Sequence, residues 1–193
     1  MNPIMFLFMV LFFGCSSAKL EVSKDTTPTQ DTPKDTNEWV TWDECAHDVG
    51  DHPCNFALMN QDGDIEELYR HHNKVIVLDL SAMWCGVCNV IATKGDELSA
   101  KYGEDKFVWI TILIDNPAGL PPELADLQLW VTTYGVESPV LAGNRDMVDL
   151  TAQEGYPITS WPTLVVIDQD MVLRHGLNGW NESVITGWVE ELL

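Results

Sequence analysis

The sequence is poor in basic residues and has no long apolar run. Lysine and arginine together number 10, against 30 aspartate and glutamate residues, so the formal net charge at pH 7 is −20. Phosphate backbones repel such a polyanion, which argues against nucleic-acid binding. The apolar run Ile4–Phe13 has ten residues. A membrane-spanning helix needs roughly 20, which excludes a polytopic membrane protein.

Several ligand-binding motifs are also missing. There is no P-loop and no glycine-rich dinucleotide fingerprint, and the pattern C-x-x-C occurs once, whereas a zinc ribbon needs it twice. The five cysteines are too few for a disulfide-dense scaffold. Apolar residues, by contrast, make up 46% of the 193 residues, which is enough to build the core of one domain of ordinary size.

The N-terminal residues have the pattern of an export signal. The length of Ile4–Phe13 suits the hydrophobic region of a secretory signal, and Gly14 before Cys15 resembles a bacterial lipobox. We therefore expect residues 1–14 to be a signal peptide and Cys15 to carry a lipid on the periplasmic face of a bacterial membrane, with Ser16 favouring the outer membrane. The alternatives are an ordinary signal peptide and an uncleaved anchor. All three take the domain out of the reducing cytosol.

A polar segment separates this signal from the rest of the chain. Residues 15–38 are rich in Ser, Thr, Asp, Pro and Lys and hold almost no large apolar residue. A segment of this composition buries too little apolar surface to fold. We expect residues 15–38 to be the lipidated N-terminus and a flexible tether, and residues 39–193 to form the folded domain.

Within the domain, apolar runs alternate with stretches of helical periodicity. Continuous runs such as Val75–Leu80 are typical of strands covered on both faces, whereas apolar positions at helical spacing after Val87 predict a helix. This alternation predicts an α/β sandwich, in which a sheet lies between helices. The predicted strands are Asn55–Met59, Val75–Leu80, Phe107–Ile114, Val140–Ala142, Thr163–Ile167 and Met171–Leu177, and the predicted helices are Val87–Tyr102, Pro121–Tyr134 and Glu182–Leu192.

The single C-x-x-C motif lies where a predicted strand gives way to a predicted helix. Cys85 and Cys88 are three residues apart, so both sulfurs lie on one side of the first helical turn, close enough to form a disulfide. The amides and the dipole of a helix start stabilise a thiolate, which makes Cys85 a nucleophile and a good leaving group. Cys88, one turn in and more buried, is expected to be the resolving thiol. The alternatives are a static disulfide and half of a zinc site.

The stretch from Val77 to Cys88 resembles the strand and active site of the thioredoxin superfamily. It has an acid, Asp79, six residues before the first cysteine, and Trp84 immediately before it. The segment before it and the inserted helix Pro121–Tyr134 resemble the extracytoplasmic TlpA/ResA-like branch, which is related to AhpC/TSA proteins. The resemblance implies a thioredoxin-like fold over about residues 55–193: a central mixed β-sheet flanked by helices, with an N-terminal β-hairpin extension and an inserted helix.

The resemblance also implies roles for single residues. Cys85 matches the attacking cysteine, Cys88 the resolving one, Trp84 the tryptophan beside the active site, and Asp79 the buried acid that exchanges a proton with the resolving thiol. Independently of the resemblance, a lone carboxylate in an apolar strand is costly, which favours a functional role and a raised pKa for Asp79. The alternative is that Asp79 faces an exposed strand end.

A second matching segment is Trp161-Pro162-Thr163. It matches the cis-proline loop of the superfamily, in which the backbone before the proline lies beside the cysteines. The resemblance therefore implies that Trp161, Pro162 and Thr163 bind substrate, and that the Trp161 backbone pairs with an extended substrate segment. Alternatively, Pro162 is an ordinary proline at the entry of a strand.

Three positions depart from the thioredoxin pattern. Gly86-Val87 stands between the cysteines where thioredoxin has Gly-Pro, Thr111 occupies the position of a lysine near the buried acid, and Ser81 replaces a tryptophan. The residues between the cysteines influence the stability of the thiolate, and hence the reduction potential. The direction of catalysis therefore stays open, and the departures argue against a cytosolic thioredoxin.

The remaining cysteines, Cys45 and Cys54, lie nine residues apart. Outside the cytosol the default is a structural disulfide closing a small loop. Two alternatives stay open. The first is a metal site formed by Cys45, His47, His52 and Cys54, whose side chains all bind transition metals. The second is a redox relay between this pair and Cys85 and Cys88.

Together these observations predict a membrane-anchored thiol–disulfide oxidoreductase, with reductase or isomerase activity and a weak preference for the reductant direction. Its partners are protein disulfide or dithiol substrates and an electron donor or acceptor that the sequence does not identify. We expect a monomer that uses no cofactor and no metal ion. A thiol peroxidase needs the pattern Pro-x-x-x-Thr-x-x-Cys, which the residues before Cys85 do not supply. The non-enzymatic alternative is a copper or zinc binding module.

Overall fold

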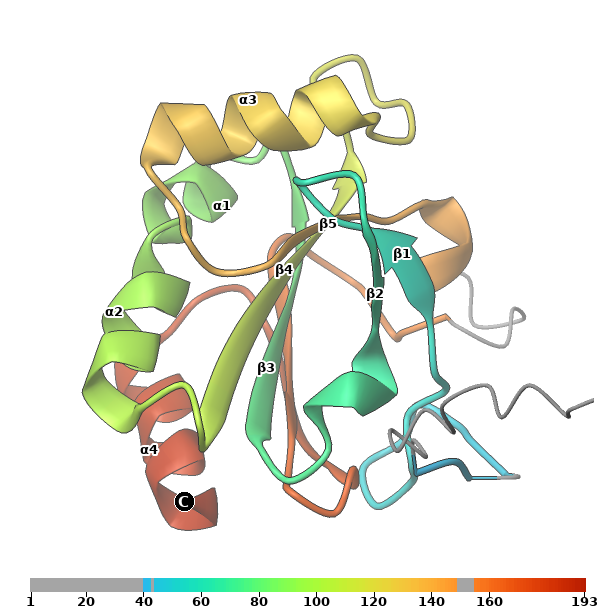
Figure 1. Ribbon diagram of the computed structural model, residues 1–193, viewed down its shortest axis with the longest axis vertical. Helices are drawn as coiled ribbons and strands as arrows, with labels where there is room; N and C mark the ends of the chain where they lie inside the picture. The colour runs from blue at the N-terminus through green and yellow to red at the C-terminus, as the bar shows by residue number, and fades with distance from the viewer. Residues whose placement is uncertain (1–39, 43, 149–154) are drawn as a thin grey trace, which may run out of the picture. The chain divides into compact units, whose positions relative to one another are not determined.

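The computed structural model describes residues 40–42, 44–148 and 155–193 (Figure 1). The predictions for the signal peptide, for lipidation at Cys15 and for the tether of residues 15–38 lie outside these described residues. Among the residues that are described, no helix has both the length and the apolar composition needed to cross a membrane.

A five-stranded sheet forms the centre of the fold, in the order β5-β4-β3-β6-β7. The strands β3, β4 and β5 run parallel, whereas β6 pairs antiparallel with β3, and β7 antiparallel with β6. The predicted α/β sandwich with a mixed sheet is therefore confirmed. The bounds are β3 Val75–Ala82, β4 Phe107–Asp115, β5 Val140–Ala142, β6 Thr163–Ile167 and β7 Leu173–Asn178.

The two central strands are covered on both faces, as their continuous apolar runs predicted. Every residue of β3 and β4 is buried. On one face Val77 packs with side chains of three helices, including Leu98 and Ile185. The opposite face of the sheet packs against a β-hairpin and two short 3-10 helices. The helical elements are α1 Gly86–Ile91, α2 Lys94–Tyr102, α3 Leu124–Tyr134 and α4 Glu182–Leu192, with the 3-10 helices Leu68–His71 and Arg145–Val148.

The expected N-terminal hairpin is present and consists of β1, Ala57–Met59, paired antiparallel with β2, Ile65–Glu67. The Asn60 side chain closes its turn by accepting the backbone N–H groups of Asp62 and Asp64, each at 3.0 Å. Strand β1 begins at Ala57 instead of Asn55, because the Asn55 side chain is hydrogen-bonded to another segment of the chain. Its oxygen accepts the backbone N–H of Tyr69 at 3.1 Å.

The predicted single helix Val87–Tyr102 is wrong, because α1 and α2 are separate helices (Figure 1). The break falls after Ala92, where Thr93 has φ −91° and ψ −2°. Beyond it, the backbone of Gly95 lies against the indole ring of Trp109 in β4, where an added Cβ would come within 2.7 Å of ring atoms. The break and the glycine together allow α2 to approach the sheet closely.

Two further boundaries differ from the prediction. Helix α3 begins at Leu124 instead of Pro121, because Glu123 and Asp126 form a capping box that fixes its start. Strand β7 begins at Leu173 instead of Met171, because Met171 lies in the preceding turn with a φ of 57°. The predicted ends of α3 at Tyr134 and of β6 at Ile167 agree with the structure.

Candidate redox-active site

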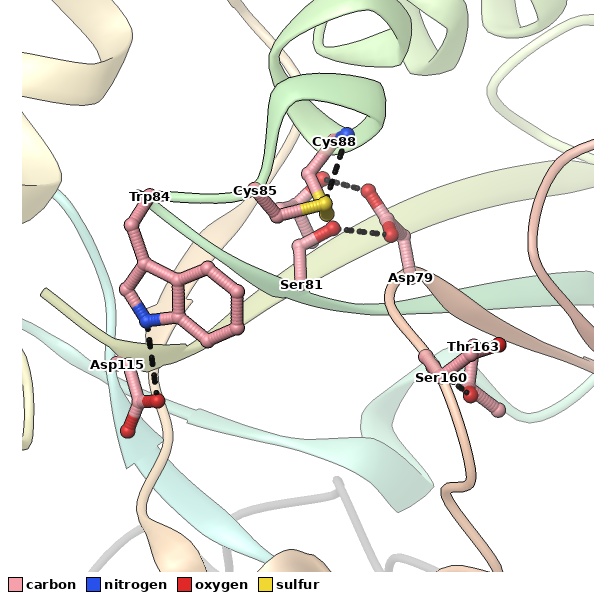
Figure 2. The surroundings of a disulfide bond; sticks show 9 residues. Asp79, Ser81, Trp84, Cys85, Cys88, Asp115, Ser160 and Thr163 are labelled. Atoms are coloured by element: carbon pink, nitrogen blue, oxygen red, sulfur yellow. Dashed lines mark hydrogen bonds between the residues drawn. A yellow bond between two sulfur atoms is a disulfide. The ribbon is translucent and has the colours of Figure 1, made fainter. Parts of the chain in front are cut away.

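The C-x-x-C motif lies at the junction of β3 and α1, and Cys85 and Cys88 are joined by a disulfide with 5.2 Å between their Cα atoms (Figure 2). Cys85 is the N-cap of α1, with an extended backbone, and its sulfur accepts the backbone N–H of Cys88 at 3.1 Å. A donor directed at this sulfur stabilises negative charge on it when the disulfide is reduced.

The two sulfur-bearing residues differ in access to solvent. Cys85 is 7% exposed and Cys88 is fully buried, so a substrate sulfur reaches only Cys85. The pair belongs to an apolar cluster at the end of the sheet below α3, which keeps water from the buried sulfur. Its other buried members are Ala82, Ala92, Leu113, Leu127, Trp130, Val136 and Val140.

Asp79 lies in β3 and is completely buried, so the alternative that it faces an exposed strand end is wrong. Its carboxylate accepts hydrogen bonds from the hydroxyl of Ser81 at 2.6 Å and, on the other oxygen, from the hydroxyl of Thr111 at 3.3 Å. The Trp109 indole N–H donates in turn to the Thr111 hydroxyl at 3.2 Å. Burial raises the pKa of Asp79 to about 7, although these hydrogen bonds partly counteract the rise.

Trp84 lies on the opposite side of the disulfide from Asp79 and is half-exposed (Figure 2). Its indole N–H donates to a carboxylate oxygen of Asp115 at 3.2 Å, and its ring meets that of Trp161 edge to face. Asp115 is fully buried and forms a two-contact ion pair with the guanidinium of Arg145. This ion pair holds the carboxylate that accepts the Trp84 N–H, and so it limits the orientation of the Trp84 ring.

Asp115 and Arg145 were not found from the sequence. The one available signal was an acid directly after the apolar run Phe107–Ile114. Arg145 is thirty residues further along the chain and reaches Asp115 from a 3-10 helix. No spacing rule links residues so far apart.

The Trp161–Pro162 peptide bond is cis. The loop is held by the Thr163 hydroxyl, which donates to the Ser160 carbonyl at 2.8 Å (Figure 2). Thr163 pairs with Leu80 in the sheet, so the loop lies beside the end of β3 that leads to Cys85. Trp161 packs against the same apolar cluster as the two cysteines. The structure thus brings the two predicted site segments together.

A second disulfide joins Cys45 and Cys54, whose Cα atoms lie 4.8 Å apart. The loop that it closes pairs with the start of β7: the Gly50 N–H donates to the Leu173 carbonyl at 2.8 Å, and the Leu173 N–H donates to the Asp51 carbonyl at 2.9 Å.

The residues of the alternative metal site have other contacts. The two sulfurs are bonded to each other, and His52 stacks on Trp42 with its Nδ1 at 2.7 Å from the Met171 carbonyl oxygen. Within residues 40–42, 44–148 and 155–193, no three His, Cys, Asp or Glu side chains are grouped so as to hold a metal ion.

Comparison with known proteins yields similar folds and short sequence matches. The exposed lipoprotein thioredoxin Etrx1 of Streptococcus pneumoniae strain TIGR4 is 27% identical with a TM-score of 0.59, covering 72% of this chain and 100% of that one. A putative thiol:disulfide interchange protein DsbE of Chlorobium tepidum has a TM-score of 0.59 at 23% identity, covering 77% of this chain and 100% of that one, which shows the fold alone.

The curated relatives are similar over a shorter stretch. Thioredoxin-T of Drosophila melanogaster is 35% identical over 61 residues, which cover 32% of this chain and 38% of that protein. The chain thus spans less than half the length of the curated relatives it matches. The model of the AhpC/TSA family matches residues 49–176. That match covers more than half of the chain, which therefore belongs to the AhpC/TSA family and has the thioredoxin fold of thiol–disulfide oxidoreductases.

Proposed function

We propose that the chain is an extracytoplasmic thiol–disulfide oxidoreductase that exchanges disulfides with protein substrates through Cys85 and Cys88. One observation carries the proposal: the more exposed sulfur accepts an N–H at the start of a helix, while the buried one lies in the cluster that adjoins a fully buried acid. A static disulfide needs neither the donor nor the acid.

In the reducing direction, the Cys85 thiolate attacks one sulfur of the substrate disulfide, and the other substrate sulfur leaves as a thiolate and takes up a proton. Cys88 then loses its proton and attacks the Cys85 sulfur of the mixed disulfide. The bond between Cys85 and the substrate breaks, and the second substrate sulfur leaves as a thiolate and takes up a proton. The products are the Cys85–Cys88 disulfide and a reduced substrate. An external dithiol donor must return two electrons before the next cycle.

Asp79 is the proposed acceptor of the Cys88 proton. A general base is most effective when its pKa lies near the working pH, and burial places the pKa of Asp79 at about 7. Figure 2 shows its carboxylate next to the disulfide, on the side away from Trp84. In the oxidising direction the same group returns the proton to Cys88.

An apolar rim around the disulfide is the proposed docking surface for a protein substrate. Trp84, Val87 and Val90 are 49, 47 and 75% exposed, although residues of this kind are usually buried. The loop Trp161–Thr163 borders the same site, and its backbone is available to an extended substrate segment. The proposal assigns substrate binding to Trp161, Pro162 and Thr163.

The proposal also covers location and direction. Residues 1–14 act as a signal peptide, Cys15 carries the lipid, residues 15–38 form the tether and residues 39–193 the domain. The similarity to a structure named as an exposed lipoprotein thioredoxin supports this arrangement. By resemblance to the TlpA/ResA-like branch, the chain works as a reductant. A reduction potential near −270 mV for Cys85–Cys88 would support that direction, and one near −120 mV would mark an oxidant.

Insulin reduction by dithiothreitol, catalysed by the purified full chain, tests the proposal. We expect the wild-type chain to accelerate the reaction and Cys85→Ser to abolish the acceleration, with the doubly substituted Cys45→Ser/Cys54→Ser chain as the control that retains it. A Cys85→Ser chain as active as the wild type would overturn the proposal. Consumption of hydrogen peroxide without insulin reduction would favour the thiol peroxidase instead, although its pattern requires threonine where this chain has Ala82.

A further inference from the structure

The carboxylate of Asp79 is held by two neutral hydroxyl groups. Ser81 donates to one of its oxygens at 2.6 Å and Thr111 donates to the other at 3.3 Å. Both donors are buried, with exposed fractions of 0% for Ser81 and 1% for Thr111, so water does not replace them. The Trp109 N–H occupies a lone pair of the Thr111 oxygen, which turns the Thr111 hydroxyl proton toward the carboxylate.

The surroundings of Asp79 otherwise offer no opposite charge. On the same face, β4 contributes Trp109 and Thr111, β6 contributes Leu164 and Val166, and the helices contribute apolar side chains such as Ile91 and Ile185. In the adjoining cluster the buried titratable groups are Cys85 and Cys88 of the motif itself, and the half-buried Tyr134 packs against it. Among the described residues, no cation contributes to the ionisation of Asp79, and its charged form depends on the hydroxyl groups and the indole.

We propose that Ser81 and Thr111 are positioning residues that hold Asp79 in its carboxylate form, so that Asp79 accepts the Cys88 proton at neutral pH. The proton transfer from Cys88 rests on the proposed function. The clamp, by which we mean the two hydroxyl groups that hold the Asp79 carboxylate, does not. A buried carboxylate without donors takes up a proton, and a protonated Asp79 no longer accepts one from Cys88. Ser81 has the larger effect because its hydrogen bond is the shorter one.

Titration of the Asp79 carboxyl carbon by NMR in the oxidised chain tests the clamp without any catalysis. The signal is assigned by its loss in Asp79→Asn. We expect Ser81→Ala to raise the pKa of Asp79 by about one to two pH units, since a hydrogen bond to a charged group is lost. Thr111→Val should raise it less, and Thr111→Ser, which keeps the hydroxyl, should restore the wild-type titration. Thr133→Val, an exposed threonine on α3, is the control.

The pH dependence of insulin reduction tests the consequence for the reaction. The acid limb of the profile should move to higher pH in Ser81→Ala and, by less, in Thr111→Val. In the Asp79→Asn background, Ser81→Ala should cause no further shift, because the serine acts through the acid. A shift that persists in that background would overturn the positioning role.

The outcomes separate this inference from the proposed function. An unchanged Asp79 titration in both Ser81→Ala and Thr111→Val, with the fold intact by circular dichroism, would overturn the clamp even if the chain reduces insulin. A wild-type chain that does not reduce insulin would overturn the function and the proton transfer, while a shifted titration would still support the clamp.

Discussion

The two disulfides have nearly the same covalent geometry and very different surroundings. Cys85–Cys88 lies at a helix start, in a cluster beside a buried carboxylate, and one of its sulfurs accepts an N–H. Cys45–Cys54 closes a loop that forms backbone hydrogen bonds to a strand edge, and His52 of this loop stacks on Trp42 and contacts the Met171 carbonyl oxygen. The first pair has a sulfur that accepts an N–H and lies near a completely buried carboxylate, whereas Cys45 lines a surface hollow with Glu44, Asp51 and His52, which are exposed or half-buried. We therefore expect the two disulfides to differ in role because their neighbours differ.

Replacing the buried cysteine tests the difference between the two disulfides most strongly. Cys88→Ser leaves Cys85 able to attack but removes the resolving thiol, so the mixed disulfide with substrate persists. We expect turnover in insulin reduction to fall about 10³-fold, equivalent to ~4 kcal/mol, and mass spectrometry to find the trapped species. The matched change at the other pair, Cys45→Ser/Cys54→Ser, should leave turnover close to that of the wild type. Equal losses at both pairs would contradict the difference in role.

The second effect concerns Asp79, the completely buried acid near Cys85–Cys88 (Figure 2). Burial raises the pKa of Asp79 from 3.8 to about 7, so the folded chain binds this proton more tightly than the unfolded chain does. The contribution of Asp79 to the free energy of unfolding is therefore fully present below pH 4 and is lost as the pH rises to about 7. The total loss is about 4 kcal/mol. Asp79→Asn should lack this loss. Urea unfolding of the oxidised chains at pH 4 and pH 8 measures it, and parallel pH dependences in the two chains would refute it.

A third effect isolates the structural contribution of the other disulfide. Removing it with Cys45→Ser/Cys54→Ser frees a short loop in the unfolded chain, and we expect a loss of about 2–3 kcal/mol in the free energy of unfolding. For a chain of this size the melting temperature should fall by about 5–10 °C, as measured by circular dichroism. A melting temperature equal to that of the wild type would show that the loop is held by its backbone hydrogen bonds alone.

The smallest effect sharpens the role of the active-site tryptophan. Trp84→Phe keeps an aromatic ring against Trp161 but removes the indole N–H that donates to Asp115. Because Asp115 keeps its ion pair with Arg145, we expect a loss of only about 1 kcal/mol in stability and a correspondingly small change in turnover. A loss of turnover as large as that expected for Cys88→Ser would mean that Trp84 takes part in the disulfide exchange itself.

Much of this arrangement could be predicted from local sequence patterns. The strands β3 and β4 follow from apolar runs, and the placement of Cys85 follows from the strand, motif and helix around it. The break between α1 and α2 was not predicted, because the apolar spacing from Val87 to Tyr102 fits one helix, and the approach of Gly95 in α2 to Trp109 in β4 is a contact between elements that this spacing does not show. The pairing of Asp115 with Arg145 was missed for the same reason.

The buried acid is an intermediate case. The sequence predicted a raised pKa for Asp79 from a carboxylate among apolar residues, and the structure places it as expected. Ser81 and Thr111 were noticed only as departures from the thioredoxin pattern. Their common role became visible once the parallel pairing of β3 with β4 set Asp79 opposite Thr111. Register between distant strands is information that a single sequence does not hold.

The loop closed by Cys45 and Cys54 also has a consequence for association between molecules. β7 is an outermost strand of the sheet, and such a strand offers its free backbone groups to any extended chain. The loop occupies both the N–H and the carbonyl of Leu173, so fewer backbone groups of β7 are free for two copies to join into one continuous sheet. Opening the loop would free these groups of Leu173, so we expect the Cys45–Cys54 bond to limit the joining of two copies edge to edge.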